Sequence, residues 1–356
     1  MAPAPDEIPA ANFPAPTGTG EMQVNNLKPY DSVDAAIHPA SSACGPANVY
    51  VPEGRVHYND RKDACLVYYF EHRIVKTGNA QILGIGSFIT VEWGALSATS
   101  RSWDHKVALA MYASTGLAIH GIWTWMRIDT SGGAKILTLT PFDSGGKLVR
   151  TGEIWWGKAH MNTINLDPNN PFRTEYSRQS FVVVTFSVHG DNLAVGQPGV
   201  ALAQVRCDSV SYIMHSGCAY GDVTGRFYLS RSDPNAKDSI LFVERAQAML
   251  PTHPGREPNY LNRATPAQAE ANRKVSTAAC APIPRPGVPG TLTEHDCDEY
   301  PFAATIQGAA SGPRYVNWDI HMVLASHNRR VGGLLIAFYN GERMFWGDRF
   351  YVVIVP

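Results

Sequence analysis

Hydrophobic residues recur at short spacing from about residue 48 to residue 230. Typical runs are CLVYYFEHRIV, ILGIGSFITVEW, KVALAMYAST and SFVVVTFSVHG, which are rich in β-branched and aromatic residues. Gly, Ser, Asp and Asn separate these runs. The pattern predicts an antiparallel β-sandwich or barrel-like domain over residues 44–232, preceded by a Pro/Ala-rich tail or linker at residues 1–43.

The spacing becomes helical after the predicted β domain. NAKDSILFVERAQAML, residues 235–250, has apolar residues close to helical spacing and predicts a helix. A second helix is expected after Thr265, because Thr is a good N-cap and Pro266 has no N–H to leave unsatisfied at the first helical position. Residues 281–294 contain four prolines and two glycines, which predicts an irregular surface loop.

The last 60 residues predict the order strand, loop, strand, helix, strand. YPFAATIQ (300–307) and RYVNWDIHMVL (314–324) each have the composition of a strand, and SHNRRVGGLLIAFYNGERM (326–344) that of a helix capped by Ser326. FYVVIV (350–355) predicts a closing strand. The whole chain is therefore expected to be α+β, with residues 233–356 forming a helical connection and a C-terminal domain.

The charge of the chain is nearly balanced. Its 356 residues include 30 Lys and Arg against 31 Asp and Glu, a formal net charge of -1, and charged residues make up 17%, below the roughly 25% that is typical. Such a chain has no global field to attract a polyanion, so any such binding must depend on local charge. No run of 18 apolar residues occurs, which excludes a membrane-spanning helix.

Six cysteines bear on the compartment. They form no C-x-x-C unit, which argues against zinc and dithiol redox chemistry. The even count and loop-like settings favour disulfides and secretion, although the chain opens with no recognisable signal peptide, which we expect to be removed or to lie on a longer precursor. Pairing of sequence neighbours is preferred among the fifteen connectivities that six cysteines allow: Cys44 with Cys65, Cys207 with Cys218, and Cys280 with Cys297.

The densest polar cluster lies in EHDCDEYPFAAT, just before the predicted strand at 300–307. Asp296, Asp298 and Glu299 fall within four residues. Carboxylates so close repel one another unless a cation, an arginine or a shared proton offsets their charge. A divalent metal with oxygen ligands is the usual resolution, and a solvated acidic loop is the alternative.

A second cluster, SHNRR, lies at the predicted start of the last helix. His327 is a candidate base or ligand, Asn328 can offer a carbonyl oxygen to a metal, and Arg329 and Arg330 can contact phosphate. If the two strands form a hairpin with this helix packed on it, the two clusters face one another. That arrangement suits one metal ion beside a scissile phosphodiester.

These motifs resemble the NucA/NucB family of secreted, non-specific deoxyribonucleases. The resemblance covers about residues 261–356 and rests on NRATPAQAEANR, CDEYPFAAT, NRRVGGLLIAFY and GDRFYVVIV. It implies a ββα-metal nuclease fold and cleavage of DNA that depends on Mg²⁺ or Mn²⁺. Upstream, the chain is similar only to the N-terminal extension of longer actinobacterial members.

The resemblance also implies roles for individual residues. Asp298 and Glu299 become the catalytic candidates, with Glu299 and Asn328 as metal ligands. Asp296 matches the first Asp of a D-x-D-E form and is an equal candidate for the base. His327 stands where the family often has an acid, so an acidic ligand from the helix is missing unless Glu342 supplies it.

The local charge fits a DNA substrate. Residues 251–356 contain ten Lys and Arg against nine acids, and nine of the ten cations are arginine, which suits bidentate phosphate contacts. Arg314, Arg329 and Arg330 are the candidate phosphate contacts. With the three cluster acids neutralised, an excess of four positive charges remains, which predicts modest, salt-sensitive binding.

The resulting hypothesis is a secreted, non-specific endodeoxyribonuclease, acting as an extracellular DNase or as an antibacterial toxin with a cognate inhibitor protein. One alternative is an inactive secreted protein that binds glycan or cell surface through the β domain, where six of the eight tryptophans lie. Core packing is the simpler interpretation of those tryptophans. Another alternative is a disulfide-rich structural protein of the envelope.

Overall fold

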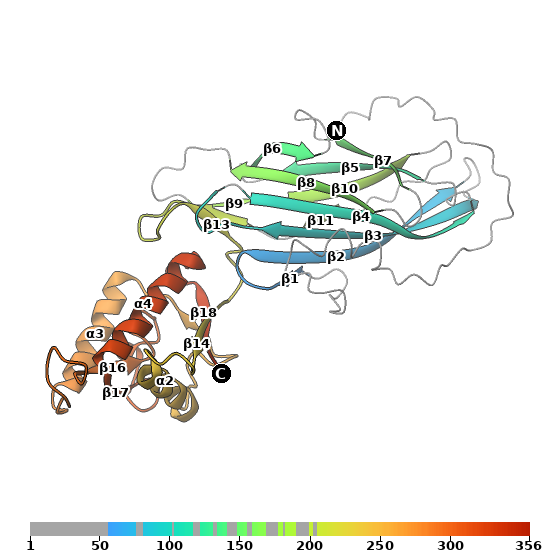
Figure 1. The fold of residues 1–356 in the computed structure, drawn as a ribbon. Helices are drawn as coiled ribbons and strands as arrows, with labels where there is room; N and C mark the ends of the chain where they lie inside the picture. Colours follow the sequence, from blue (N-terminus) through green and yellow to red (C-terminus); the bar gives the residue numbers. More distant parts are fainter. Residues whose placement is uncertain are drawn as a thin grey trace. The chain divides into compact units, whose positions relative to one another are not determined.

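The computed structural model divides the chain into two compact units, Met1–Asp208 and Ser209–Pro356. It describes residues 56–75, 81–101, 103–116, 122–130, 134–140, 148–154, 159–168, 177–180, 182–189, 199–201 and 205–356. The predicted tail at 1–43 and Cys44 lie outside the described residues. Figure 1 shows the fold, and each unit is considered by itself below.

The regular secondary structure in the described part of the first unit consists of strands. A six-stranded sheet has the order β1 (Val56–Tyr58), β2 (Asp63–Val75), β3 (Ile82–Ala95), β4 (Trp103–Gly116), β8 (Ala159–Pro168) and β6 (Ala134–Thr140). A four-stranded sheet has the order β11 (Gly199–Ala201), β10 (Val182–His189), β5 (Ile122–Thr130) and β7 (Leu148–Ile154). β9 (Ser177–Ser180) pairs with β12 (Val205–Asp208).

Neighbouring strands of the first unit are antiparallel, as the alternating runs predict. Within the described ranges the strands form separate sheets and no closed barrel. Trp103 is 2% exposed, which agrees with core packing. Trp155 and Trp156 lie outside the described residues.

The second unit mixes helices and strands, so the expected α+β class is confirmed. It contains β13 (Gly217–Ala219), β14 (Gly225–Ser230), α2 (Lys237–Met249), β15 (Leu261–Asn262), α3 (Pro266–Cys280), β16 (His295–Tyr300), β17 (Asp319–Leu324), α4 (Ala325–Gly341) and β18 (Arg349–Val355), with a short 3-10 turn at Ala309–Ser311.

The division between the units lies earlier than the predicted boundary at residue 232. β14, which the sequence pattern groups with the β domain, pairs in parallel with β18 at the end of the chain. β15 pairs with the other edge of β18. The sequence of β14, GRFYLS, does not identify its partner strand, so only the pairing shows which unit contains it.

The helices of the second unit begin much as predicted. α2 buries Ile240, Phe242 and Val243, the apolar positions at helical spacing. α3 begins after Thr265 with Pro266 at its first position, and a capping box links the side chain of Thr265 with Gln268. The spacing of apolar residues in α2 and the capping residues of α3 were therefore sufficient to predict both helices from the sequence.

The two-stranded sheet of β16 and β17 packs against α2, α3 and α4 (Figure 1). The hydrophobic core beside it draws on α2, α4, β14, β18 and the segment after β16, with these buried members among others: Phe227, Leu229, Ile240, Phe242, Val243, Tyr300, Phe302, Val331, Leu335, Tyr339, Phe350 and Val352.

The predicted hairpin strands were wrong in position. The first strand is His295–Tyr300, so the acidic cluster lies within it and not before it. It ends before Pro301, which has no N–H for the ladder, and residues 301–307 are mostly turns. β17 begins only at Asp319. Cross-strand pairing and tertiary packing thus override the apolar composition of 301–307.

The predicted cap of the last helix was also wrong. α4 begins at Ala325, its N-cap is Leu324, and no side chain caps it. The N–H of Ala325 instead donates to the carbonyl of Glu294, 2.8 Å away. The helix therefore follows β17 without a connecting loop and starts against the entrance to β16.

One predicted disulfide is confirmed. Cys280 at the end of α3 is bonded to Cys297 in β16, and it closes the irregular loop at residues 281–294. Cys65, Cys207 and Cys218 are also disulfide-bonded. The described helices include none that is long and apolar enough to cross a membrane.

Candidate active site

The hairpin and α4 together position the acidic cluster. β16 and β17 are antiparallel, with Asp298 opposite His321 and Glu299 opposite Ile320. β17 ends at Leu324 and α4 begins at Ala325, so Asn328 lies in the first turn of the helix, close to the hairpin. The strand, strand and helix therefore form one scaffold that brings two sequence-distant clusters to one place.

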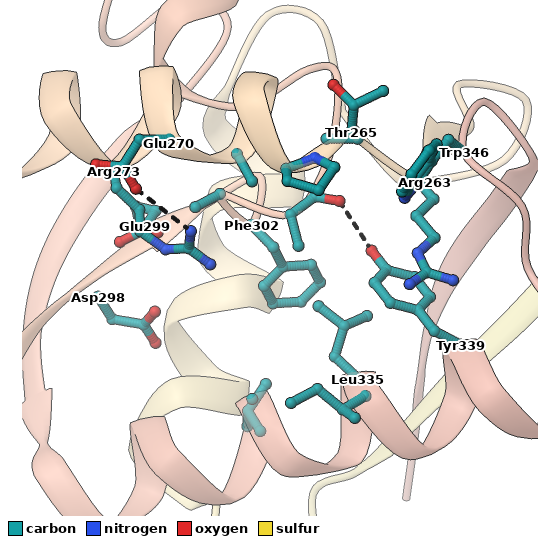
Figure 2. A pocket seen from close by; sticks show the side chains of 18 of the residues that line it. Arg263, Thr265, Glu270, Arg273, Asp298, Glu299, Phe302, Leu335, Tyr339 and Trp346 are labelled. Atoms are coloured by element: carbon teal, nitrogen blue, oxygen red, sulfur yellow. Dashed lines mark hydrogen bonds and ion pairs between the residues drawn. The ribbon is translucent and has the colours of Figure 1, made fainter. Parts of the chain in front are cut away.

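A pocket of about 650 Å³ lies between this scaffold and α3 (Figure 2). Asp298, Glu299 and Asn328 line it together, as the facing clusters predicted. The other lining residues include several that were not singled out as site residues: Arg263, Thr265, Glu270, Arg273, Phe302, Gly332, Leu335, Tyr339 and Trp346.

Asp298 is the most perturbed acid of the pocket. Its side chain is buried, with the residue only 7% exposed, and burial raises the pKa of its carboxyl from 3.8 to about 7. The neighbouring charge of Glu299 contributes to this rise, whereas the Ser239 hydroxyl at the start of α2 opposes it. Asp298 therefore has a proton affinity suited to exchange at neutral pH.

Glu299 is perturbed in the same direction. Burial raises the pKa of its carboxyl, and a backbone hydrogen bond from Ala303 and the charge of Arg273 oppose that rise. Arg273 lies one helical turn from Glu270 on α3, with 3.9 Å between Nη1 and Oε2. Figure 2 shows the Arg273 side chain reaching from α3 toward the two acids of β16.

Asn272 holds the segment that follows β16. Its side-chain amide donates to the carbonyls of Ala303 and Thr305 at 2.9 and 2.8 Å, and its oxygen accepts from the N–H of Ala310 at 2.9 Å. The residue is 2% exposed, so all of these bonds are shielded from water. α3 thus fixes the backbone next to Glu299.

Gly332 leaves the helical side of the pocket open. A Cβ at this position would meet no protein atom within 4 Å, so packing does not require glycine here. Glycine inside a helix costs about 1 kcal/mol relative to alanine. The residue lines the pocket, and its missing side chain allows a ligand to approach the α4 backbone.

Two predicted site residues have other partners. Asp296 is absent from the pocket lining, and its Oδ2 lies 4.0 Å from Nη2 of Arg329, which is closer to Glu294 at 3.2 Å. His327 accepts the backbone N–H of Asp238 through Nδ1 at 3.2 Å. His327 therefore joins α4 to the first turn of α2, and it is not among the residues that line the pocket.

The predicted phosphate contacts also lie away from the pocket lining. Arg330 pairs with Asp233 at 3.2 Å, and Arg314 pairs with Asp319 at 3.2 Å. The arginines that do line the pocket are Arg263 and Arg273. Both arginines belong to the motif NRATPAQAEANR, which carries the family resemblance. The sequence does not show which polar residues of this motif face the acids, because that depends on how α3 packs against the hairpin.

Metal ligation in this pocket requires a mixed set of donors. Within residues 56–356, as far as they are described, no group of three or more His, Cys, Asp or Glu side chains is placed to hold a metal ion. The set of Asp298, Glu299 and Asn328 instead combines two carboxylates with one amide. Glu342, the predicted substitute ligand, is not part of the lining.

The comparison with known families agrees with this geometry. Residues 250–353 match the family model of deoxyribonuclease NucA/NucB. Searches of curated proteins and of solved structures found no significant match. The match supports a deoxyribonuclease in the C-terminal unit, with DNA as its substrate, and confirms the resemblance that the motifs indicated.

Proposed function

We propose that the C-terminal unit, a NucA/NucB-type deoxyribonuclease domain, is a metal-dependent endonuclease that hydrolyses DNA phosphodiester bonds without marked sequence preference. The observation that carries the proposal is the convergence of Asp298, Glu299 and Asn328 in one pocket. Two carboxyls with raised pKa values beside an amide oxygen form a site that favours a cation.

The donor chemistry suits Mg²⁺ or Mn²⁺. Both are hard cations that take oxygen ligands, and Mg²⁺ commonly keeps several waters beside one or two carboxylates. Glu299 and Asn328 would hold the ion, and its charge would oppose the rise in the pKa of Asp298 that burial and the charge of Glu299 cause. When bound, the ion stabilises negative charge on the oxygens of the scissile phosphate.

Asp298 is the proposed general base. A pKa of about 7 leaves its carboxyl close to half ionised at neutral pH, so it can accept a proton from an attacking water. Asp296, the alternative base, pairs with Arg329 outside the pocket lining. Arg273 lies beside Glu299 and is placed to contact a phosphate oxygen.

Binding is expected to depend on the backbone of DNA more than on base sequence. Arginine offers bidentate contacts to phosphate oxygens, which carry no sequence information. Arg263 and Arg273 are the arginines of the pocket. The affinity should therefore fall as salt increases.

The disulfides support action in an oxidising compartment. Cys280–Cys297 ties α3 to β16, the two elements that supply Arg273 and Glu299. Such bonds persist in secreted proteins. An extracellular DNase or an antibacterial toxin is the corresponding role, and a toxin would require a cognate inhibitor protein in the producing cell.

Plasmid cleavage tests the proposal. The full chain should cut supercoiled DNA with Mg²⁺ or Mn²⁺ and lose this activity in EDTA, and Asp298→Asn and Glu299→Gln should each reduce the rate at least a hundredfold. Asp296→Asn is the matched control from the same strand and should remain within a few fold of wild type. Metal-independent cleavage, or a loss confined to Asp296→Asn, would contradict the assignment.

A further inference from the structure

An aromatic pair lies at the end of the pocket opposite the acids. Figure 2 shows Asp298 and Glu299 at one side and Trp346 and Arg263 at the other. The rings of Trp346 and Tyr212 are stacked, with centroids 4.0 Å apart and planes inclined by 12°. Trp346 lines the pocket and remains 42% exposed, although tryptophan is highly buried on average.

A tight turn holds Trp346 in this position. The N–H of Asp348 donates to the carbonyl of Phe345 at 3.0 Å, and the carboxylate of Asp348 accepts the N–H of Phe345 at 2.8 Å. Gly347 has a φ of +86°, which this turn requires and which glycine adopts without strain. Backbone hydrogen bonds join Arg263 to both Gly347 and Asp348. The exposed indole of Trp346 therefore belongs to a turn that several hydrogen bonds hold in place.

Arg263 places a positive charge next to the stacked rings. Its guanidinium lies 5.1 Å from the ring centroid of Tyr212 and 4.7 Å from that of Tyr339. It donates to the carbonyls of Met344 and Tyr212. In the described part of the chain no carboxylate forms an ion pair with it at 4.0 Å or less. Asp348 is the acid whose charge acts on Arg263, but its carboxylate makes no ion pair with the guanidinium within that distance. An anion in the pocket can therefore still approach Arg263.

We propose that Trp346, Tyr212 and Arg263 form a nucleobase platform that makes single-stranded DNA the preferred substrate. The inference rests on the proposed nuclease function and adds a substrate class to it. An unpaired base would stack on the free face of Trp346, and a phosphate of the same strand would pair with Arg263. Aromatic side chains bind bases of single strands in this way, whatever the sequence.

Duplex DNA fits this platform poorly. In a duplex both faces of each base are covered by its neighbours, so stacking on Trp346 requires a base that is unpaired or at a frayed end. Tyr212 lies outside residues 250–353, the range that matches the family model. The platform therefore combines the nuclease domain with a residue that precedes it in the chain.

Equilibrium binding without metal tests the platform apart from catalysis. Fluorescence anisotropy in EDTA would measure the affinity of the full chain for a labelled single-stranded 12-mer and for the matching 12-base-pair duplex. Wild type should bind the single strand more tightly. Trp346→Ala should weaken that binding about tenfold and leave duplex binding nearly unchanged, since one stacked base contributes about this factor. Trp346→Phe should retain part of the difference.

Tyr228→Ala is the matched control, because Tyr228 is 56% exposed in β14 and does not line the pocket. It should bind both DNAs like wild type. Three results would each contradict the proposed platform. Wild type could bind both DNAs equally, it could fail to bind the single strand, or Trp346→Ala could weaken the binding of both DNAs by the same factor. Plasmid cleavage in metal is measured separately, so a failed platform with intact cleavage is distinct from a failed nuclease assignment.

Discussion

Asp298 allows a quantitative test of the site through protein stability. Burial raises the pKa of its carboxyl from 3.8 to about 7, and the charge of Glu299 adds to the rise. A difference of about three pKa units corresponds to about 4 kcal/mol between the protonated and ionised forms. Asp298→Asn replaces the acid with a neutral side chain of nearly the same shape, so it mimics the protonated form at every pH.

The sign of the effect follows from the direction of the shift. Because the pKa is higher in the folded state, the folded state holds its proton more tightly than the unfolded state. The contribution of Asp298 is fully favourable below pH 3.8 and is lost as pH rises toward 7. Asp298→Asn should therefore match wild type near pH 4, exceed its free energy of unfolding by about 2 kcal/mol near pH 5.5, and exceed it by about 4 kcal/mol at pH 8.

Pulse proteolysis across a urea series in EDTA is a suitable assay. Mass spectrometry of peptides from residues 209–356 would follow the C-terminal unit separately from the rest of the chain. Adding Mn²⁺ at pH 8 should narrow the gap between the two proteins, since a cation stabilises the ionised carboxylate of wild type. A difference between Asp298→Asn and wild type that is the same at pH 5 and pH 8 would refute the argument from burial.

Three further predictions concern the elements around the pocket. Replacing Cys280 and Cys297 with Ser should lower the free energy of unfolding by about 3 kcal/mol, since the bridge spans 17 residues, and urea denaturation would measure it. Thr265→Ala should reduce that free energy by about 1 kcal/mol in the same assay because it removes the capping box of α3; no change would mean that the cap is not formed in solution. Arg273→Gln removes a charge that lowers the pKa of Glu299, so the acidic limb of the pH profile for plasmid cleavage should move to higher pH, whereas an unchanged limb would show that Arg273 does not affect the acid.

The sequence was a good guide to helices and a poor one to the catalytic strand. The spacing of apolar residues in α2, and Thr265 before Pro266 in α3, are local signals, and both helices formed as expected. HDCDEY has no alternation of apolar and polar residues, so nothing local identifies it as β16. It becomes a strand by pairing with β17, which the single sequence does not reveal.

The candidate site was partly predictable for a similar reason. Asp298, Glu299 and Asn328 belong to motifs that carry the family resemblance, and the structure brings them into one pocket. His327 belongs to the same stretch of sequence, yet it contacts Asp238 of α2. Which face of α4 meets which element depends on packing, and proximity in sequence does not determine it.

The sequence by itself determined the residue types available for chemistry, the family of the C-terminal region and the periodicity of its helices. Tertiary structure decided that Asp298 is buried, that Arg273 from α3 meets the acids of β16, and that Trp346 and Arg263 share their pocket. The physical reason is that desolvation and charge coupling depend on distances between groups far apart in the chain. Those distances exist only after the hydrophobic core has brought α3, α4 and the hairpin together.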